Sequence, residues 1–169
     1  MKSLENCCKS LNEANAQVNR STGLHVHIGA KGITDEQYVN IFINYQRLES
    51  VIDSFMARSR RMNNNCFCKS LRGFDFEDCN NRIDVALMIN SRYYKVNPES
   101  YRRHNTIEFR KHKGSTDFEK ISNWVNFCMK LVAWSKKNRL ESNITSIDEI
   151  PFLTAKEKRF FNSRREALN

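Results

Sequence analysis

Two short stretches of the chain alternate strictly between apolar and polar residues, which is the pattern of a strand with one buried face. The first runs over residues 24–28 and the second over residues 106–110. The polar faces carry His25 and His27 in the first stretch, and Thr106, Glu108 and Arg110 in the second. A further strand is predicted over residues 92–97, where Pro98 ends it.

Longer stretches repeat apolar residues at helical spacing, and turn-forming clusters separate them. The helix after the first strand begins at Thr34, a good capping residue, and the last helix begins at Thr154, where Glu157 completes a capping box. The predicted elements are helices over 2–18, 35–60, 81–90, 117–137 and 154–168, a short helical turn at 145–150, a turn at 19–23, and irregular chain over 66–80.

These elements indicate an α+β fold, with a small, mainly antiparallel sheet packed by several helices. Only two prolines and five glycines occur among the 169 residues, which favours long helices over a turn-rich β fold. In the 81–90 helix the spacing predicts that Ile83, Leu87 and Ile89 point toward the core. We expect a single domain over residues 1–169, in which residues 139–169 form a basic, helical C-terminal extension.

The chain carries no feature of membrane insertion or secretion. No apolar run approaches the ~18 residues that a membrane span needs, and no apolar segment of a signal peptide separates Lys2 from Lys9. We therefore expect a cytoplasmic protein without membrane contact, in which the six cysteines are free thiols. A zinc site of Cys66, Cys68 and Cys79 is the alternative, although it lacks the usual spacing.

The net charge of +9 is concentrated in two regions, residues 54–73 and 91–113. These bases could gather a nucleoside triphosphate, bind nucleic acid, or form an ordinary solvated surface. The regions also hold Phe67, Tyr93, Tyr94 and Tyr101, and mixed aromatic and basic residues suit single-stranded nucleic acid. The candidates for nucleic-acid or phosphate binding are Arg58, Arg60, Arg61, Lys69, Arg72, Arg102, Arg103, Lys111 and Lys113.

If the two alternating strands share a sheet, one face displays two imidazoles, a carboxylate and a guanidinium. A carboxylate such as Glu108 supplies an oxygen to Mg²⁺, and a guanidinium such as Arg110 forks onto phosphate oxygens. His25 and His27 can contact either metal or phosphate. Each pair alone has a plainer interpretation, because such alternation is common in solvent-facing strands and surface ion pairs.

The segment from Asn19 to His27, N-R-S-T-G-L-H-V-H, resembles the glycine–histidine strand of the glutamine synthetase and carboxylate–amine ligase superfamily. Residues 106–110 resemble its later strand, which bears a metal-binding Glu and a phosphate-binding Arg. The closer resemblance is to the amidoligase family of phages, mobile elements and their hosts, and it runs from about residue 4 to residue 135. The further residues that carry it are Arg60 and Arg61 with Cys66, the strand Arg92-Tyr93-Tyr94-Lys95-Val96-Asn97, the segment Thr106 to His112, and Trp124.

The resemblance implies a shortened glutamine-synthetase-type catalytic half-barrel and an ATP- and Mg²⁺-dependent ligase. Such an enzyme phosphorylates a carboxylate, and an amine of a small molecule or peptide then forms an amide. By position, Glu108 and His25 would bind Mg²⁺, Arg110 would contact the transferring phosphate, and His25 and His27 would contact ATP. Arg92, Arg103 and Arg60 are weaker candidates for the nucleotide or the carboxylate, since intrachain pairing explains each equally well.

The chain departs from the family at its start, because members usually begin with strands that bear an E-x-E motif. We therefore expect an N-terminally shortened domain with an incomplete metal site. Two functions remain open: a ligase of a bacterial cytoplasm, or a non-catalytic phage or mobile-element protein that binds nucleic acid or a host ribonucleoprotein, for example as a counter-defence inhibitor of the anti-CRISPR type. We also expect an open sheet edge, covered by the N-terminal helix, by a second copy in a homodimer, or by a partner.

Overall fold

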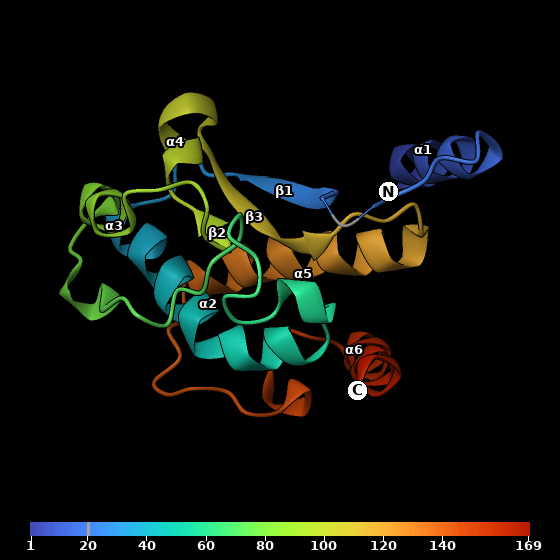
Figure 1. The fold of residues 1–169 in the computed structure, drawn as a ribbon. Helices are drawn as coiled ribbons and strands as arrows, with labels where there is room; N and C mark the ends of the chain where they lie inside the picture. The colour runs from blue at the N-terminus through green and yellow to red at the C-terminus, as the bar shows by residue number, and fades with distance from the viewer. Residues whose placement is uncertain (20) are drawn as a thin grey trace.

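The computed structural model describes residues 1–19 and 21–169, and Arg20, part of the predicted turn at 19–23, lies outside the described residues. Within the described part the chain is α+β, with six α-helices and a small, open, antiparallel sheet of three strands (Figure 1). The helices are α1 (Lys2–Glu13), α2 (Asp35–Ser54), α3 (Arg82–Ile89), α4 (Glu99–His104), α5 (Phe118–Ser135) and α6 (Ala155–Leu168). The strands are β1 (Gly23–Gly29), β2 (Val96–Asn97) and β3 (Thr106–Lys113).

Strand β3 lies at the centre of the sheet, in the order β1-β3-β2, and pairs antiparallel with both neighbours. The register sets Glu108 opposite His27 on one side and opposite Asn97 on the other. The two alternating segments of the sequence therefore share a sheet, which is the condition for their polar side chains to lie on one face.

The apolar face of the sheet packs on α2 and α5, which lie side by side beneath it (Figure 1).

This core is rich in aromatic residues. Trp124 and Phe127 of α5 stack with ring centroids 5.3 Å apart, and Tyr45 of α2 lies 5.9 Å from Phe109 of β3. Phe161 of α6 packs into the same core, so both the sheet and the last helix rest on one apolar cluster.

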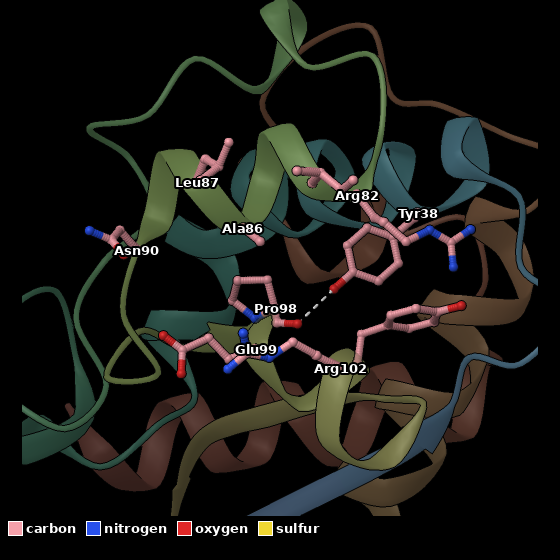
Figure 2. A pocket seen from close by; sticks show the side chains of 10 residues that line it. Tyr38, Arg82, Ala86, Leu87, Asn90, Pro98, Glu99 and Arg102 are labelled. Atoms are coloured by element: carbon pink, nitrogen blue, oxygen red, sulfur yellow. Dashed lines mark hydrogen bonds between the residues drawn. The ribbon is translucent and has the colours of Figure 1, made fainter.

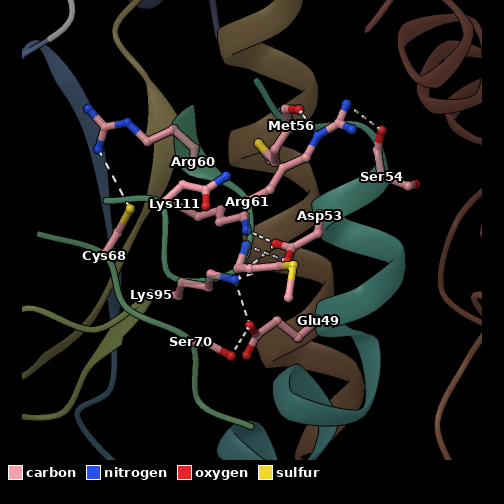
Figure 3. A network of polar contacts seen from close by, with 12 residues as sticks. Glu49, Asp53, Ser54, Met56, Arg60, Arg61, Cys68, Ser70, Lys95 and Lys111 are labelled. Carbon is pink, nitrogen blue, oxygen red and sulfur yellow. Dashed lines mark hydrogen bonds and ion pairs between the residues drawn. The ribbon is translucent and has the colours of Figure 1, made fainter. Parts of the chain in front are cut away.

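Buried charges join α2 to the sheet beside this core (Figure 3). The Lys95 Nζ donates to Glu49 Oε1 at 2.5 Å and to Asp53 Oδ1 at 2.9 Å, and Lys95 is fully buried. Lys111 of β3 forms an ion pair with Asp53 and is equally buried. Alternation along β3 turns Lys111 toward the core, on the same face as Ile107 and Phe109. Its buried charge is compensated there by Asp53 of α2.

Several helix ends differ from the predicted ones. Helix α1 stops at Glu13 rather than residue 18, and Asn15 then takes a left-handed conformation at φ 51°. Helix α2 stops at Ser54 rather than at residue 60. At this helix end the Arg61 guanidinium donates hydrogen bonds to the carbonyls of Ser54 and Met56. The capping boxes at Thr34 and Thr154 are both present, as predicted.

The predicted strand at 92–97 is paired with β3 only at Val96 and Asn97. Just before it, Tyr94 bridges to Lys69 of the preceding loop, with Lys69 N donating to Tyr93 O at 2.8 Å. Helix α4 follows Pro98 and was not predicted, because its six residues carry too little apolar periodicity to detect.

The prediction for the buried face of α3 was right for Ile89 and wrong for Ile83 and Leu87. Val85 and Ile89 are buried, whereas Ile83 and Leu87 are 65% and 71% exposed. The helix is apolar on both sides, so its sequence spacing alone could not choose the inner one.

Helix α1 packs mainly against α5. Covering the edge of the sheet, as predicted for this helix, is therefore not its main contact. No helix in the described part of the chain is both long and apolar enough to cross a lipid bilayer. The cysteines are free thiols, and the described residues hold no group of three His, Cys, Asp or Glu arranged for a metal ion, so Cys66, Cys68 and Cys79 form no zinc site there.

Candidate functional site

The polar residues of β1, β2 and β3 converge in one pocket on the face of the sheet opposite α2 and α5. The pocket has a volume of about 290 Å³. Its lining combines three imidazoles and three guanidinium groups with two carboxylates; the residues are His25, His27, Arg92, Asn97, Glu99, Ser100, Arg103, His104, Glu108 and Arg110. The predicted residues His25, His27, Glu108, Arg110, Arg92 and Arg103 therefore lie in the same pocket, whereas Arg60, also predicted as a candidate for the nucleotide or the carboxylate, does not line it.

Glu108 is the hub of this pocket. Its Oε1 lies 2.9 Å from His25 Nδ1, accepts from Arg110 Nη1 at 2.8 Å, and lies 3.6 Å from His27 Nε2. Its Oε2 accepts from Asn97 Nδ2 at 2.6 Å. The four predicted residues thus form one connected cluster rather than separate surface pairs.

This environment keeps Glu108 ionised. Burial alone would raise the pKa of the carboxyl, but hydrogen bonds from His25 and Asn97 and the Arg110 guanidinium outweigh it and lower the pKa to about 2. Glu108 is therefore an anion at any physiological pH. It is suited to orient cations and not to shuttle protons.

A break in the β1–β3 register shapes the cluster at His25. Leu24 pairs with His112 and Val26 with Phe109, so Arg110 and Lys111 together oppose the single residue His25. Such a bulge re-aims side chains locally, and here it leaves the Arg110 side chain on the pocket face, beside His25. Gly23 leaves room for this arrangement, because a Cβ there would lie 3.3 Å from His25 Nε2.

The rim of the pocket comes from α4 and the segment before β2. His27 Nδ1 bonds Thr106 Oγ1 at 2.9 Å, and its ring meets His104 edge-on at 5.9 Å. Arg92 and Arg103 are exposed at this rim. Asn97, Glu99, Ser100 and His104 were not predicted as site residues; Asn97 alone had a signal, as the last residue of the R-Y-x-x-V-N strand.

The basic residues predicted for nucleic acid divide into two groups. Arg58, Lys69, Arg72, Arg102, Arg103 and Lys113 are exposed. Arg60 and Lys111 are buried, and Arg61 is half-buried. Arg60 donates to Thr22 O and Cys68 Sγ, and Lys111 forms an ion pair with Asp53. Because both side chains make internal contacts, neither belongs to an accessible basic surface.

The pocket offers more guanidinium donors than carboxylate ligands. Arg110, Arg92 and Arg103 line it with fork-shaped donors that match phosphate oxygens. Glu108 has both oxygens engaged by protein donors, and no three-ligand metal cluster exists among the described residues. Mg²⁺ commonly binds with few carboxylates when substrate phosphates supply the other oxygens, so an ion held by Glu108 would need further oxygen ligands from a bound substrate.

A second, larger cavity of about 520 Å³ lies between α3 and α4 (Figure 2). The exposed Ile83 and Leu87 border it, and the Arg82 guanidinium lies over the Tyr101 ring at 4.4 Å. Glu99 lines both this cavity and the polar pocket. The two hollows therefore adjoin at α4.

Fold and pocket together define an α+β protein with a cluster of basic and acidic side chains on the open face of a small sheet. A family described as "Putative amidoligase enzyme" matches residues 1–132, and the chain belongs to this family. The match takes in every residue of the pocket, since the last of them is Arg110. None of the curated proteins and none of the solved structures that were compared matches the chain.

Proposed function

We propose that this protein is an ATP-dependent amidoligase that joins a carboxylate to an amine. A carboxylate oxygen attacks the γ-phosphorus of ATP and ADP leaves. The amine then attacks the carbonyl carbon of the acyl phosphate, phosphate leaves with the bonding electrons, and the nitrogen loses a proton to give the amide. Family membership supports this reaction class, and the pocket supports where it takes place.

The observation that carries the proposal is the convergence of Glu108, Arg110, His25 and His27 in one pocket. Phosphoryl transfer needs little covalent chemistry from the protein, and most of its catalysis is positioning and charge stabilisation. Arg110, fixed by Glu108 and by the Phe67 carbonyl at 3.2 Å, is a preorganised donor for the transferring phosphate. Arg92 and Arg103 at the rim would hold the remaining phosphates.

Bound Mg²⁺ would neutralise phosphate charge, with Glu108 and His25 as the nearest ligands from this chain. We propose that further oxygen ligands come from a second copy of the chain or from a partner. Strand β1 pairs only with β3 in the described part of the chain, so its outer edge, beside His25 and His27, is free to accept another strand. This interface would place new side chains at the pocket.

The test is Mg-ATP binding by calorimetry together with release of ADP, for the wild type, Glu108→Gln and Arg110→Ala. Loss of one preorganised donor costs about 10²–10³-fold in rate, and we expect that loss for Arg110→Ala. Glu119→Gln, an exposed acid on α5, is the matched control and should behave as the wild type. Turnover that is unaffected in both pocket variants would remove the pocket from the reaction.

A second candidate function rests on the exposed bases. We propose as the alternative a non-catalytic phage or mobile-element protein whose Arg102, Arg103, Lys113, Lys69 and Arg58 bind nucleic acid or a host ribonucleoprotein in a counter-defence role. Binding of this kind weakens steeply with salt and should tolerate Glu108→Gln. Salt-dependent nucleic-acid affinity with no ATP turnover would favour it over the ligase.

A further inference from the structure

Two large aromatic side chains stand exposed beside the polar pocket. Phe67 is 54% exposed and Tyr93 is 36% exposed, although apolar side chains of this size usually bury most of their surface. Their rings meet edge-to-face, with centroids 5.5 Å apart and planes 68° apart. We call this pair, Phe67 and Tyr93, the aromatic corner.

The backbone holds the aromatic corner in place. Lys69 N donates to Tyr93 O at 2.8 Å, and Lys95 N donates to Lys69 O at 3.0 Å, so the loop that carries Phe67 is stitched to the segment that carries Tyr93. The Phe67 carbonyl also accepts from Arg110 Nε. Arg110, which lines the pocket, thus also helps to hold the aromatic corner in place.

Two arginines connect the corner to the pocket. The Arg92 guanidinium lies 5.1 Å from the Tyr93 ring centroid, and that of Arg110 lies 5.9 Å from it. Both arginines also line the pocket around Glu108. A ligand with phosphates on these guanidinium groups would therefore have its other end beside Phe67 and Tyr93.

We propose that the aromatic corner stacks the base of the nucleotide whose phosphates enter the pocket, with Phe67 as the stacking face and Tyr93 as its support. The inference rests on the proposed function, because it assigns the base end of the same nucleotide. Aromatic side chains bind bases through the π-face that every base has, so the corner confers affinity for a nucleotide over bare polyphosphate and gives little choice among bases.

A mononucleotide fits the corner better than a polynucleotide strand. Strand binding uses successive aromatic platforms along an open groove, whereas Tyr94 and Tyr101, the other two aromatics considered for nucleic-acid binding, are engaged in contacts within the protein. Tyr94 packs on Phe74 at 5.1 Å, and Tyr101 lies beneath the Arg82 guanidinium. One aromatic pair at the mouth of one small pocket matches one base followed by a short phosphate chain.

Calorimetry with two probes, ATP and inorganic tripolyphosphate, each with Mg²⁺, tests the assignment. We expect the wild-type protein to bind ATP more tightly than tripolyphosphate. Phe67→Ala should weaken ATP binding roughly 5- to 100-fold and leave tripolyphosphate, which has no base, at its wild-type affinity. Phe67→Trp should keep the ATP preference and Phe67→Leu should lose it, since only tryptophan retains a π-face.

Met129→Ala is the control for general loss of exposed apolar surface, because Met129 is 51% exposed on α5. It should bind both probes as the wild type does. Equal affinity of the wild type for ATP and tripolyphosphate, or an unchanged ATP affinity in Phe67→Ala, overturns the base assignment while the proposed function stands. Binding of neither probe overturns both. A single-stranded oligonucleotide that binds more tightly than ATP and depends on Phe67 also overturns it, in favour of strand binding.

Discussion

The pKa values of individual residues are shifted on both faces of the sheet. The shift keeps one residue charged and another neutral. On the pocket face, Glu108 stays ionised because its partners outweigh its burial. On the core face, His112 is 4% exposed, and its ring lies 5.9 Å from that of Trp124. Burial lowers the pKa of His112 to about 4, against a weaker opposing effect of its hydrogen bond to Lys113 O. A neutral imidazole is therefore part of the folded state.

His112 predicts loss of stability in mild acid. The unfolded chain takes up a proton at this residue near its ordinary pKa of 6.5, whereas the folded protein does so only near 4. Stability is therefore complete above pH 6.5 and falls as the pH drops from 6.5 to 4. Urea unfolding across this range should show that slope in the wild type and lose it in His112→Asn, which cannot titrate. An equal slope in the variant would assign the effect to other groups.

At the scale of secondary structure, the contact between α2 and the sheet depends on buried ions as well as on apolar packing. Glu49 and Asp53 lie one turn apart on α2. They form ion pairs with Lys95 and Lys111, which the sheet side contributes (Figure 3). Glu49 also accepts from Ser70 Oγ and Leu71 N, so it holds the loop after α2 as well. The network fixes how helix, sheet and loop meet.

Removing one member of this network should cost far more than removing an exposed partner. Lys95→Met leaves two buried carboxylates undercompensated, and we expect a loss of about 3–5 kcal/mol in unfolding free energy. Arg72→Met, whose side chain is 41% exposed at the edge of the same acids, should cost about 0–1 kcal/mol. Denaturant unfolding measures both. Similar losses for the two variants would show that burial does not set the energetics here.

At the scale of the whole molecule, the small sheet divides the protein into an apolar side and a polar side. Helices α2, α5 and α6 share one core, and α2 and α5 lie below the sheet in Figure 1. The pocket lies on the opposite face of the sheet. Phe161 of α6 stacks at 4.5 Å from Phe55 and meets Phe127 edge-on at 5.7 Å. The C-terminal helix is therefore tied to the helices that carry the sheet.

This shared core predicts that the protein unfolds as one cooperative unit. Phe161→Ala should lower the unfolding free energy by about 3–5 kcal/mol and shift a single transition seen both by circular dichroism and by tryptophan fluorescence. Met129→Ala, at an exposed position of α5, serves as the control and should change stability by less than about 0.5 kcal/mol. A separate early transition in Phe161→Ala would instead mark residues 139–169 as an independent unit.

The sequence by itself determined the elements with strong local signals. Strict alternation gave β1 and β3 and the side on which His25, His27, Glu108 and Arg110 lie, and the capping boxes gave the starts of α2 and α6. These features follow from neighbours within a few residues, so they can be read along the chain.

Only the tertiary structure decided which groups meet. The burial of Lys111 and Arg60 depends on acids and carbonyls that lie 58 and 38 residues away in the chain, and no local pattern encodes such partners. The same is true of the exposed Ile83 and Leu87, of Asn97 beneath Glu108, and of the aromatic corner. Packing chose among faces that the sequence left equivalent, because burial energy depends on the neighbours that the fold supplies.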